Sequence, residues 1–275
     1  FFFFFMIRPP PKYTPKPSSA ASDVYKRQDV EIADYPYTTK EPVVGMMKYE
    51  DVQIQLVEIP STFDKEFLNI VRNCDGIVFV LDGTKDLFKQ KNELLRLMEE
   101  NRIKINEEPK NVKIEKRSFG GIEIRGEKYI KDSIDEVKQI LMASSFNNCL
   151  VVVNEPVTID DIMDALDRSL VYKNAIFVIT KNEFFKPEEV KQQIWNMLCL
   201  IRVYTKSPLK NEPEKRPITL PVGSTVKDLA KKLHKDFLRR FKFAKVFGKS
   251  VRHGKGKVGL DHKLEDGDIV EIHVK

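Results

Sequence analysis

The residues of this sequence best suited to binding chemistry are cations, and they are concentrated near the C-terminus. Between Lys227 and Lys257 there are twelve lysine or arginine residues against two acids, Asp228 and Asp236. This excess of ten positive charges is larger than the net charge of +6 of the whole chain, so the rest of the sequence is net negative. Clustered positive charge attracts polyanions, and the segregation therefore predicts a nucleic-acid site in this segment.

Nine of these cations are the predicted RNA contacts. Some lie on or after a predicted helix, and the others lie in a glycine-punctuated loop that can follow a phosphate backbone. The alternative is a solvated helix face, which is the usual role of a run of lysines on a protein surface. The predicted contacts are Lys231, Lys235, Arg239, Arg240, Lys242, Lys249, Arg252, Lys255 and Lys257.

The cysteines and the apolar runs exclude other classes of site. Cys74, Cys149 and Cys199 are far apart and form no C-x-x-C pair, so they indicate neither a disulfide framework nor a zinc site. No apolar run approaches the length of about 20 residues that spans a bilayer. These features predict a protein of the reducing cytoplasm with no membrane partner.

The central part of the chain has the pattern of an α/β sheet. Residues 43–49 and 52–59 are β-rich runs separated by two acids, which predicts an antiparallel hairpin. Residues 77–81 are an uninterrupted apolar run, typical of a strand buried on both faces of a parallel sheet, and the apolar run at residues 175–179 resumes that sheet. Between these two runs, residues 102–170 interrupt the alternation of strands and helices.

Three helix starts are predicted from local signals. Ser133 with Glu136 and Thr158 with Asp161 have the spacing of N-terminal caps, in which a side-chain oxygen accepts from a backbone N–H. Pro187 is suited to the first turn of a third helix, because its missing N–H would have no helical partner there.

From about Arg202 a second domain is predicted. Two short strands are followed by one helix, which begins after Ser224 and carries Phe237 on its buried face. Further strands follow, the last at residues 269–274 after an Asp-Gly-Asp turn. Two strands, a helix and more strands within about 70 residues is the layout of a β-grasp fold.

The first 28 residues fit neither domain. Five phenylalanines precede a Pro/Lys/Ser stretch with no periodicity, whereas a signal peptide carries positive charge before a longer apolar core. We therefore expect residues 1–28 to be a disordered or artefactual tail, associated with N-terminal truncation, and to lie outside the fold.

Several strings resemble an Obg-class GTPase in their order along the chain. They are ADYPYTT (33–39), VQIQLVEIPS (52–61), VRNCDGIVFVLD (71–82) and IFVITKNE (176–183). The C-terminal strings LIRVYTK (200–206), LPVGSTVKDLAKKLHKDF (220–237) and VFGKSVRHGKGKVGLDHKLEDGDIVEI (246–272) resemble the TGS domain of the developmentally regulated GTP-binding proteins, a branch of that class.

This resemblance implies a fold class and a domain division. The fold class is α/β, a P-loop-GTPase-like parallel sheet that lacks its phosphate loop, with a small α/β insertion and a C-terminal β-grasp (TGS) domain. The implied boundaries are 29–201 for a partial G domain, 102–170 for the insertion within it, and 202–275 for the TGS domain.

The resemblance also implies GTP and magnesium as ligands, the ribosome or ribosomal RNA as a partner, and possible dependence on a dedicated partner protein. Thr39 matches the switch threonine that senses magnesium and the γ-phosphate; its alternative role is that of a plain loop threonine. Glu58 and Ser61 occupy the switch positions where the family has aspartate and glycine. A longer carboxylate and an added Cβ at these positions would disturb the contacts with magnesium and the γ-phosphate.

Recognition of the base departs from the family pattern as well. Thr180, Lys181 and Glu183 match the family's Asn-Lys-x-Asp motif, with two substitutions. A glutamate still accepts hydrogen bonds from guanine, although its side chain is longer. The alternative is a strand end followed by a turn with no ligand.

The phosphate loop is absent from this sequence. G-x-x-x-x-G-K-[ST] is needed because glycines let backbone N–H groups cradle the phosphates while the lysine supplies charge. The first glycine of the chain is Gly45, which lies after the expected position. Two hypotheses therefore remain, a GTP-hydrolysing protein whose intact form carries the loop, and a non-catalytic RNA- or ribosome-binding adaptor with a degenerate G domain.

Overall fold

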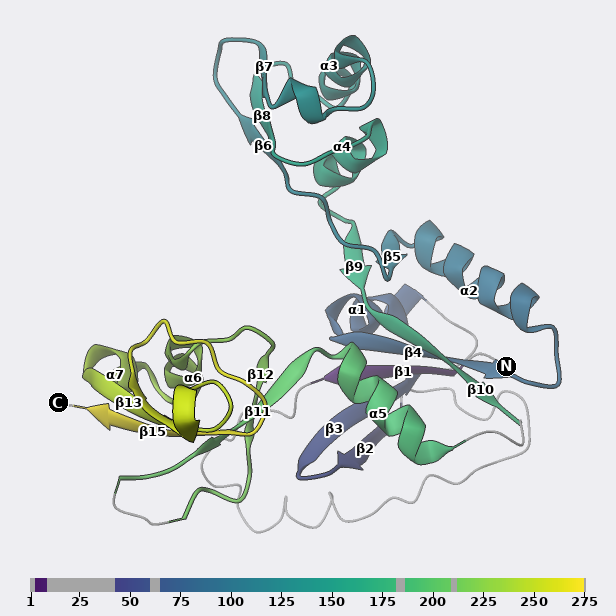
Figure 1. The fold of residues 1–275 in the computed structure, drawn as a ribbon. Coiled ribbons are helices and arrows are strands. Elements are labelled where there is room, and N and C mark those ends of the chain that lie inside the picture. Colours follow the sequence, from purple (N-terminus) through teal and green to yellow (C-terminus); the bar gives the residue numbers. More distant parts are fainter. Residues whose placement is uncertain (1–2, 9–42, 60–64, 182–185, 209–211, 275) are drawn as a thin grey trace. The chain divides into compact units, whose positions relative to one another are not determined.

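The chain forms two compact units, which we describe separately. The computed structural model describes residues 3–8, 43–59, 65–181, 186–208 and 212–274. One unit combines Phe1–Leu87 with Ala175–Lys275, and the other is Phe88–Asn174 (Figure 1). Both are mixed α/β structures, as the predicted fold class requires.

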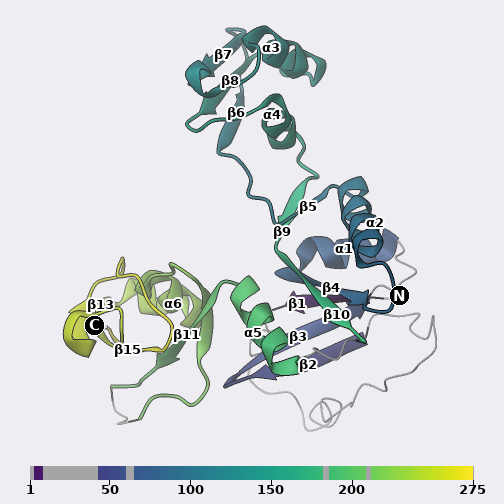
Figure 2. The ribbon, with the colours of Figure 1, turned by 45° about the vertical axis from the view of Figure 1, so that its right-hand side comes forward.

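A five-stranded sheet of order β10-β4-β1-β3-β2 belongs to the first unit (Figure 2). Strands β3, β4 and β10 run parallel, and β1 and β2 run antiparallel to them. The strands are β1 (Phe3–Arg8), β2 (Val43–Tyr49), β3 (Val52–Ile59), β4 (Gly76–Asp82) and β10 (Ala175–Thr180). The predicted hairpin is thus confirmed, with Tyr49 registered against Val52.

The two apolar runs differ in burial because they differ in position. Every residue of β4 is buried, as its uninterrupted apolar run predicts for an internal strand. Strand β10 is the outer strand beside β4, and among its residues only Ala175 and Val178 are buried. The prediction of burial on both faces is therefore confirmed for residues 77–81, and residues 175–179 form the predicted strand of the parallel sheet.

The N-terminal residues require a correction. We expected residues 1–28 to lie outside the fold, but Phe3–Arg8 form β1, an internal strand paired antiparallel to both β3 and β4. The run FFFMIR is apolar and rich in aromatic residues, which suits it to the middle of a sheet. Residues 9–28 lie outside the described part of the chain, so the rest of that expectation stays a prediction.

One face of this sheet carries helix α5 (Pro187–Met197), which begins at the predicted proline. The helix contacts both β10 and β2, so it crosses the sheet (Figure 2). The indole of Trp195 stacks on Tyr49 with ring centroids 5.5 Å apart. Trp195 also belongs to the buried cluster that contains Val78 and Val178, so α5 and the sheet share one core. Helix α1 (Lys65–Asn73) precedes β4.

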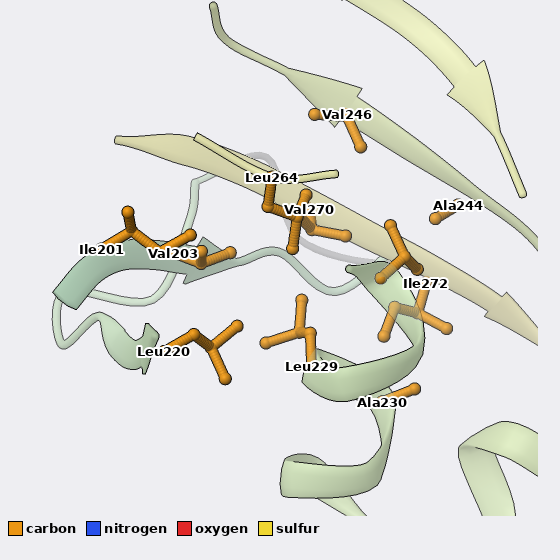
Figure 3. Close-up of a cluster of buried hydrophobic side chains, with 11 residues drawn as sticks. Ile201, Val203, Leu220, Leu229, Ala230, Ala244, Val246, Leu264, Val270 and Ile272 are labelled. Atoms are coloured by element: carbon orange, nitrogen blue, oxygen red, sulfur yellow. The ribbon is translucent and has the colours of Figure 1, made fainter. Parts of the chain in front are cut away.

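A second five-stranded sheet, of order β12-β11-β15-β13-β14, forms the C-terminal β-grasp. Its strands are β11 (Leu200–Thr205), β12 (Ile218–Pro221), β13 (Phe241–Phe247), β14 (Lys255–Val258) and β15 (Asp268–Val274). Helix α6 (Val226–Leu233) packs Leu229 and Ala230 against one face of the sheet (Figure 3). Alternate residues of the strands, including Val203 and Val246, complete this core.

Two local features of this sheet differ from expectation. The predicted single helix ends at Leu233, and a short helix, α7 (Lys235–Arg239), follows because His234 is extended and its ring nitrogen accepts from the N–H of Asp236. The predicted glycine-punctuated loop is in part β14, which pairs with β13. The connection between the two strands is residues 248–254, which end in a short 3-10 turn, η2 (Arg252–Gly254).

The second unit holds a three-stranded sheet of order β6-β8-β7 with helices that share its core. Its elements are α2 (Leu87–Glu100), β5 (Ile103–Ile105), β6 (Val112–Lys116), β7 (Ile122–Arg125), η1 (Glu127–Tyr129), α3 (Ile134–Ala143), β8 (Cys149–Val153), α4 (Ile159–Leu166) and β9 (Val171–Lys173). The cap predicted at Thr158 is confirmed, since its Oγ1 accepts from the N–H of Asp161. The cap predicted at Ser133 is wrong, because that side chain makes no capping hydrogen bond although α3 begins there.

Candidate nucleic-acid interface and nucleotide site

The predicted base-recognition residues follow the last residue of β10. Thr180 ends the strand, and its Oγ1 donates to the carbonyl oxygen of Leu81 on the neighbouring β4 at 3.2 Å. Lys181 follows with a positive φ of 53°, and its Nζ lies 3.3 Å from Oδ2 of Asp82. The parallel pairing thus brings Thr180 and Lys181 to the carboxyl ends of two strands, the edge where open α/β sheets bind ligands.

Asp82 organises this edge, and sequence reasoning did not single it out. Its side chain is only 6% exposed. The carboxylate accepts a hydrogen bond from Oγ1 of Thr84 at 2.6 Å and another from its backbone N–H at 3.0 Å. These bonds, together with Lys181, lower the pKa of Asp82 to about 2 against the opposing effect of burial. Asp82 is therefore ionised at neutral pH and holds the Lys181 ammonium at the strand ends.

Gly83 lets the two strand ends approach closely. Its N–H donates to the carbonyl oxygen of Thr180 at 2.9 Å, and a Cβ at this position would lie 2.7 Å from that oxygen. A side chain at position 83 would therefore push β4 and β10 apart. The signal for this site was present in the sequence as an aspartate and a glycine directly after a buried apolar run.

The structure describes only part of the remaining nucleotide site. Glu58 lies on β3, registered with Val43 on β2. Thr39, Ser61 and Glu183 lie outside the described residues. Their predicted roles toward magnesium, the γ-phosphate and the base therefore stay predictions.

The described residues of the predicted base site lie together at one edge of the sheet, whereas the sequence lacks the motif that holds the phosphates. Thr180, Lys181 and Asp82 form a polar edge at the carboxyl ends of β4 and β10. The sequence contains no G-x-x-x-x-G-K-[ST], so backbone donors in the phosphate-loop arrangement and its lysine are absent from this chain. Within the described ranges, no three His, Cys, Asp or Glu side chains are grouped so that they could hold a metal ion.

The predicted RNA contacts are exposed but fall on two sides of the β-grasp. Eight of the nine are exposed, and the side chain of Lys235 lies outside the described side chains. Lys231, on α6, belongs to the helix side. Lys255 and Lys257, on β14, point to the outer side of the sheet, because Val258 of the same strand packs into the core on the inner side. The structure thus places Lys231 in a helix-side group and Lys255 and Lys257 in a sheet-side group.

The sheet-side group has partners that sequence reasoning missed. The Nζ atoms of Lys255 and Lys257 lie over the rings of Phe247 and Phe243, at 5.3 Å and 4.1 Å from the ring centroids. The alternation of β13, FKFAKVF, was a signal for this arrangement. It places two aromatic rings and a lysine on the face opposite the buried Ala244 and Val246.

In the part of the chain that the structure describes, we find no helix both long enough and apolar enough to span a membrane.

Family models match the chain in three consecutive segments. A model described as a 50S ribosome-binding GTPase matches residues 18–116. A model of the C-terminal region of the MMR_HSR1 domain matches residues 119–206, and the TGS domain model matches residues 201–274. The last match coincides with the β-grasp sheet and its helices.

Individual relatives cover most of the chain. Developmentally-regulated GTP-binding protein 1 of Xenopus laevis is 30% identical, and the match covers 88% of this chain and 75% of that protein. A GTP-binding protein of Methanocaldococcus jannaschii is 32% identical, with 89% and 72% covered. Ribosome-interacting GTPase 1 of Saccharomyces cerevisiae is 28% identical, with 88% and 75% covered.

Proposed function

Because this chain belongs to the family of developmentally regulated GTP-binding proteins, we propose that it is a cytoplasmic protein that associates with the ribosome and acts in translation. In this proposal the TGS module at residues 202–275 contacts ribosomal RNA. The partial G domain at 29–201, with its insertion at 102–170, is the nucleotide-responsive part. A dedicated partner protein is compatible with this role.

The observation that carries the proposal is the segregation of charge. The segment from Lys227 to Lys257 holds an excess of ten positive charges in a chain whose net charge is +6. Ten of the twelve cations of this segment are exposed, Lys245 is partly buried, and the side chain of Lys235 lies outside the described side chains. The family model described as a 50S ribosome-binding GTPase and the yeast ribosome-interacting GTPase support a ribosomal partner.

Phosphate contacts predict a steep dependence of binding on salt. Each contact releases counterions, and about 4 contacts would weaken binding roughly 100-fold between about 50 and 200 mM salt. A surface that merely solvates a helix would give no such slope, because it makes no phosphate contacts.

The test is co-sedimentation with ribosomes after charge reversal on the module. We expect the triple change Arg239→Glu, Arg240→Glu and Arg252→Glu to abolish co-sedimentation, since all three side chains are exposed and sit within the basic segment. The matched control reverses three exposed cations of the second unit, Lys113, Lys131 and Arg168. Retained co-sedimentation of the module variant, or an equal loss in the control, would contradict the proposed RNA contact.

The nucleotide role is proposed in two forms. In the first, the intact protein binds GTP with magnesium and hydrolyses it, with Thr39, Glu58 and Ser61 at the switch and Thr180, Lys181 and Glu183 near the base. In the second, the chain is a non-catalytic adaptor with a degenerate G domain. The missing phosphate loop favours the second form for this sequence.

A titration of this chain with a fluorescent GTP analogue separates the two forms. Saturable binding that weakens in Lys181→Ala would support a working nucleotide site, because Lys181 lies at the described strand edge. Absence of binding, with ribosome association intact, would support the adaptor.

A further inference from the structure

The outer face of the C-terminal sheet, opposite α6, presents aromatic and basic side chains together. Val246 and Val270 point inward to the core shown in Figure 3. Successive side chains of a strand point to opposite faces, so Phe247 on β13 and Glu271 on β15 belong to the outer face. A solvated sheet face would instead carry small polar and charged residues without stacked rings.

Two rings on this face stack across neighbouring strands. Phe243 on β13 is registered with His273 on β15, and their ring centroids are 4.3 Å apart with an angle of 16° between the planes. Lys257, on β14 at the other side of β13, places its Nζ 4.1 Å from the Phe243 centroid. The stack therefore runs across three strands in the order His273, Phe243, Lys257. All three side chains remain at least partly exposed.

A second ring lies further along β13. Phe247 is flanked by Nζ of Lys255 at 5.3 Å and Nζ of Lys206 at 5.5 Å from its centroid. Lysine ammonium groups beside aromatic rings supply two kinds of contact at once, a π face and a positive charge.

One buried carboxylate orients nearby cations without neutralising the face. Glu271 lies between Lys245, at 3.3 Å, and Lys206, at 3.8 Å, and Nε2 of His273 is 2.5 Å from its Oε1. The hydrogen bonds from His273 and Lys245 hold its pKa below the usual value, although burial acts in the opposite direction. Four lysines surround this single carboxylate, so the cluster as a whole carries a net positive charge. They are Lys206 and Lys245 beside Glu271, and Lys255 and Lys257 beside the rings.

We propose that this outer face is a stacking platform for unpaired RNA, on which bases replace the lysine ammonium groups against the rings of Phe243 and Phe247 while the displaced lysines contact the phosphates. The inference rests on the proposed RNA contact of the module and names the form of RNA that it binds. Unpaired bases expose their π faces, whereas an A-form duplex hides them in its stack. An acidic protein partner would use the lysines but would gain nothing from the rings.

The experiment measures fluorescence anisotropy of a labelled single-stranded RNA of about 12 nucleotides, and of the same sequence as a duplex, titrated with the full chain. We expect the single strand to bind more tightly than the duplex. Phe243→Leu and Phe247→Leu should each weaken single-strand binding about tenfold, the size typical of one lost base stack, and should leave duplex binding nearly unchanged.

The matched control is Phe119→Leu, which removes an aromatic ring that is 83% exposed in the second unit. Circular dichroism checks that each variant keeps its β-grasp. Lys257→Gln is a second variant that leaves both rings in place and should weaken binding and reduce its salt dependence. Phe243→Tyr keeps the ring and should retain wild-type affinity.

Two results would overturn the platform. One is single-strand affinity in the folded leucine variants equal to that of Phe119→Leu, and the other is an equal loss for single strand and duplex. If the leucine variants bind oligonucleotides normally and the charge-reversal variant still loses ribosomes, the platform fails and the proposed function stands. If charge reversal leaves ribosome co-sedimentation intact, the proposed function itself fails.

Discussion

Replacing Asp82 by asparagine tests how the carboxyl ends of β4 and β10 are held together. The buried carboxylate accepts from Thr84 and pairs with Lys181, and its pKa is lowered from 3.8 to about 2. A difference of this size between folded and unfolded chains corresponds to about 2 kcal/mol of stability at pH 7. We therefore expect Asp82→Asn to lower the free energy of unfolding of this sheet by about 2 kcal/mol at pH 7.

The pH dependence of this loss has a defined sign. The pKa of Asp82 is lower in the folded chain, so the ionised carboxylate stabilises the fold above its unfolded pKa of 3.8. That stabilisation disappears as the pH falls toward about 2. At pH 3 the difference between wild type and Asp82→Asn should have shrunk to about 1 kcal/mol.

The assay uses the single tryptophan of the chain. Trp195 is buried in the cluster that contains Val78 of β4 and Val178 of β10, so its fluorescence during urea unfolding reports this sheet. Removal of the exposed carboxylate in Asp261→Asn is the control and should change stability little. A loss at pH 7 below about 0.5 kcal/mol, or a loss of the same size at pH 3, would refute the assigned role of the ionised carboxylate.

Two further predictions concern local backbone structure. Gly248→Ala should destabilise the β-grasp by about 3 kcal/mol or more, because the added Cβ would lie 2.0 Å from Oδ1 of Asp268. Gly259→Ala is the control and should change stability little, because no atom lies within 4 Å of its added Cβ. Urea unfolding followed by circular dichroism compares the two variants. Thr158→Ala should lower the free energy of unfolding by about 1 kcal/mol, because it removes the helix cap, whereas Ser133→Ala should change it little. Thermal unfolding compares the two variants. Equal losses of stability would contradict the cap assignment.

Much of the first sheet was predictable because its signals are local. The apolar run of β4 and the two β-rich runs of the hairpin are contained in windows of fewer than ten residues. Pro187 also marked the start of α5 by a local signal. A proline has no N–H, and an N–H in the first helical turn would have no partner within the helix.

The errors arose where a partner distant in the sequence decides the outcome. Phe3–Arg8 became a strand because β3 and β4 flank it on both sides, and no local pattern announces those neighbours. Residues 255–258 became β14 through pairing with β13, although Gly256 lies within the strand. The break at His234 has a local cause instead, because the His234 ring accepts a hydrogen bond from the N–H of Asp236, which helix periodicity does not report.

The sequence by itself determined that positive charge gathers in one segment and that no phosphate loop is present, because composition and motif spacing do not depend on folding. Only the tertiary structure decided which side chains share a surface. The two faces of a strand alternate and α6 covers one of them, so Lys257 lies beside the Phe243 ring while the next residue, Val258, packs against the core. In the same way Asp82 and Lys181, 99 residues apart, meet only because β4 and β10 pair in parallel.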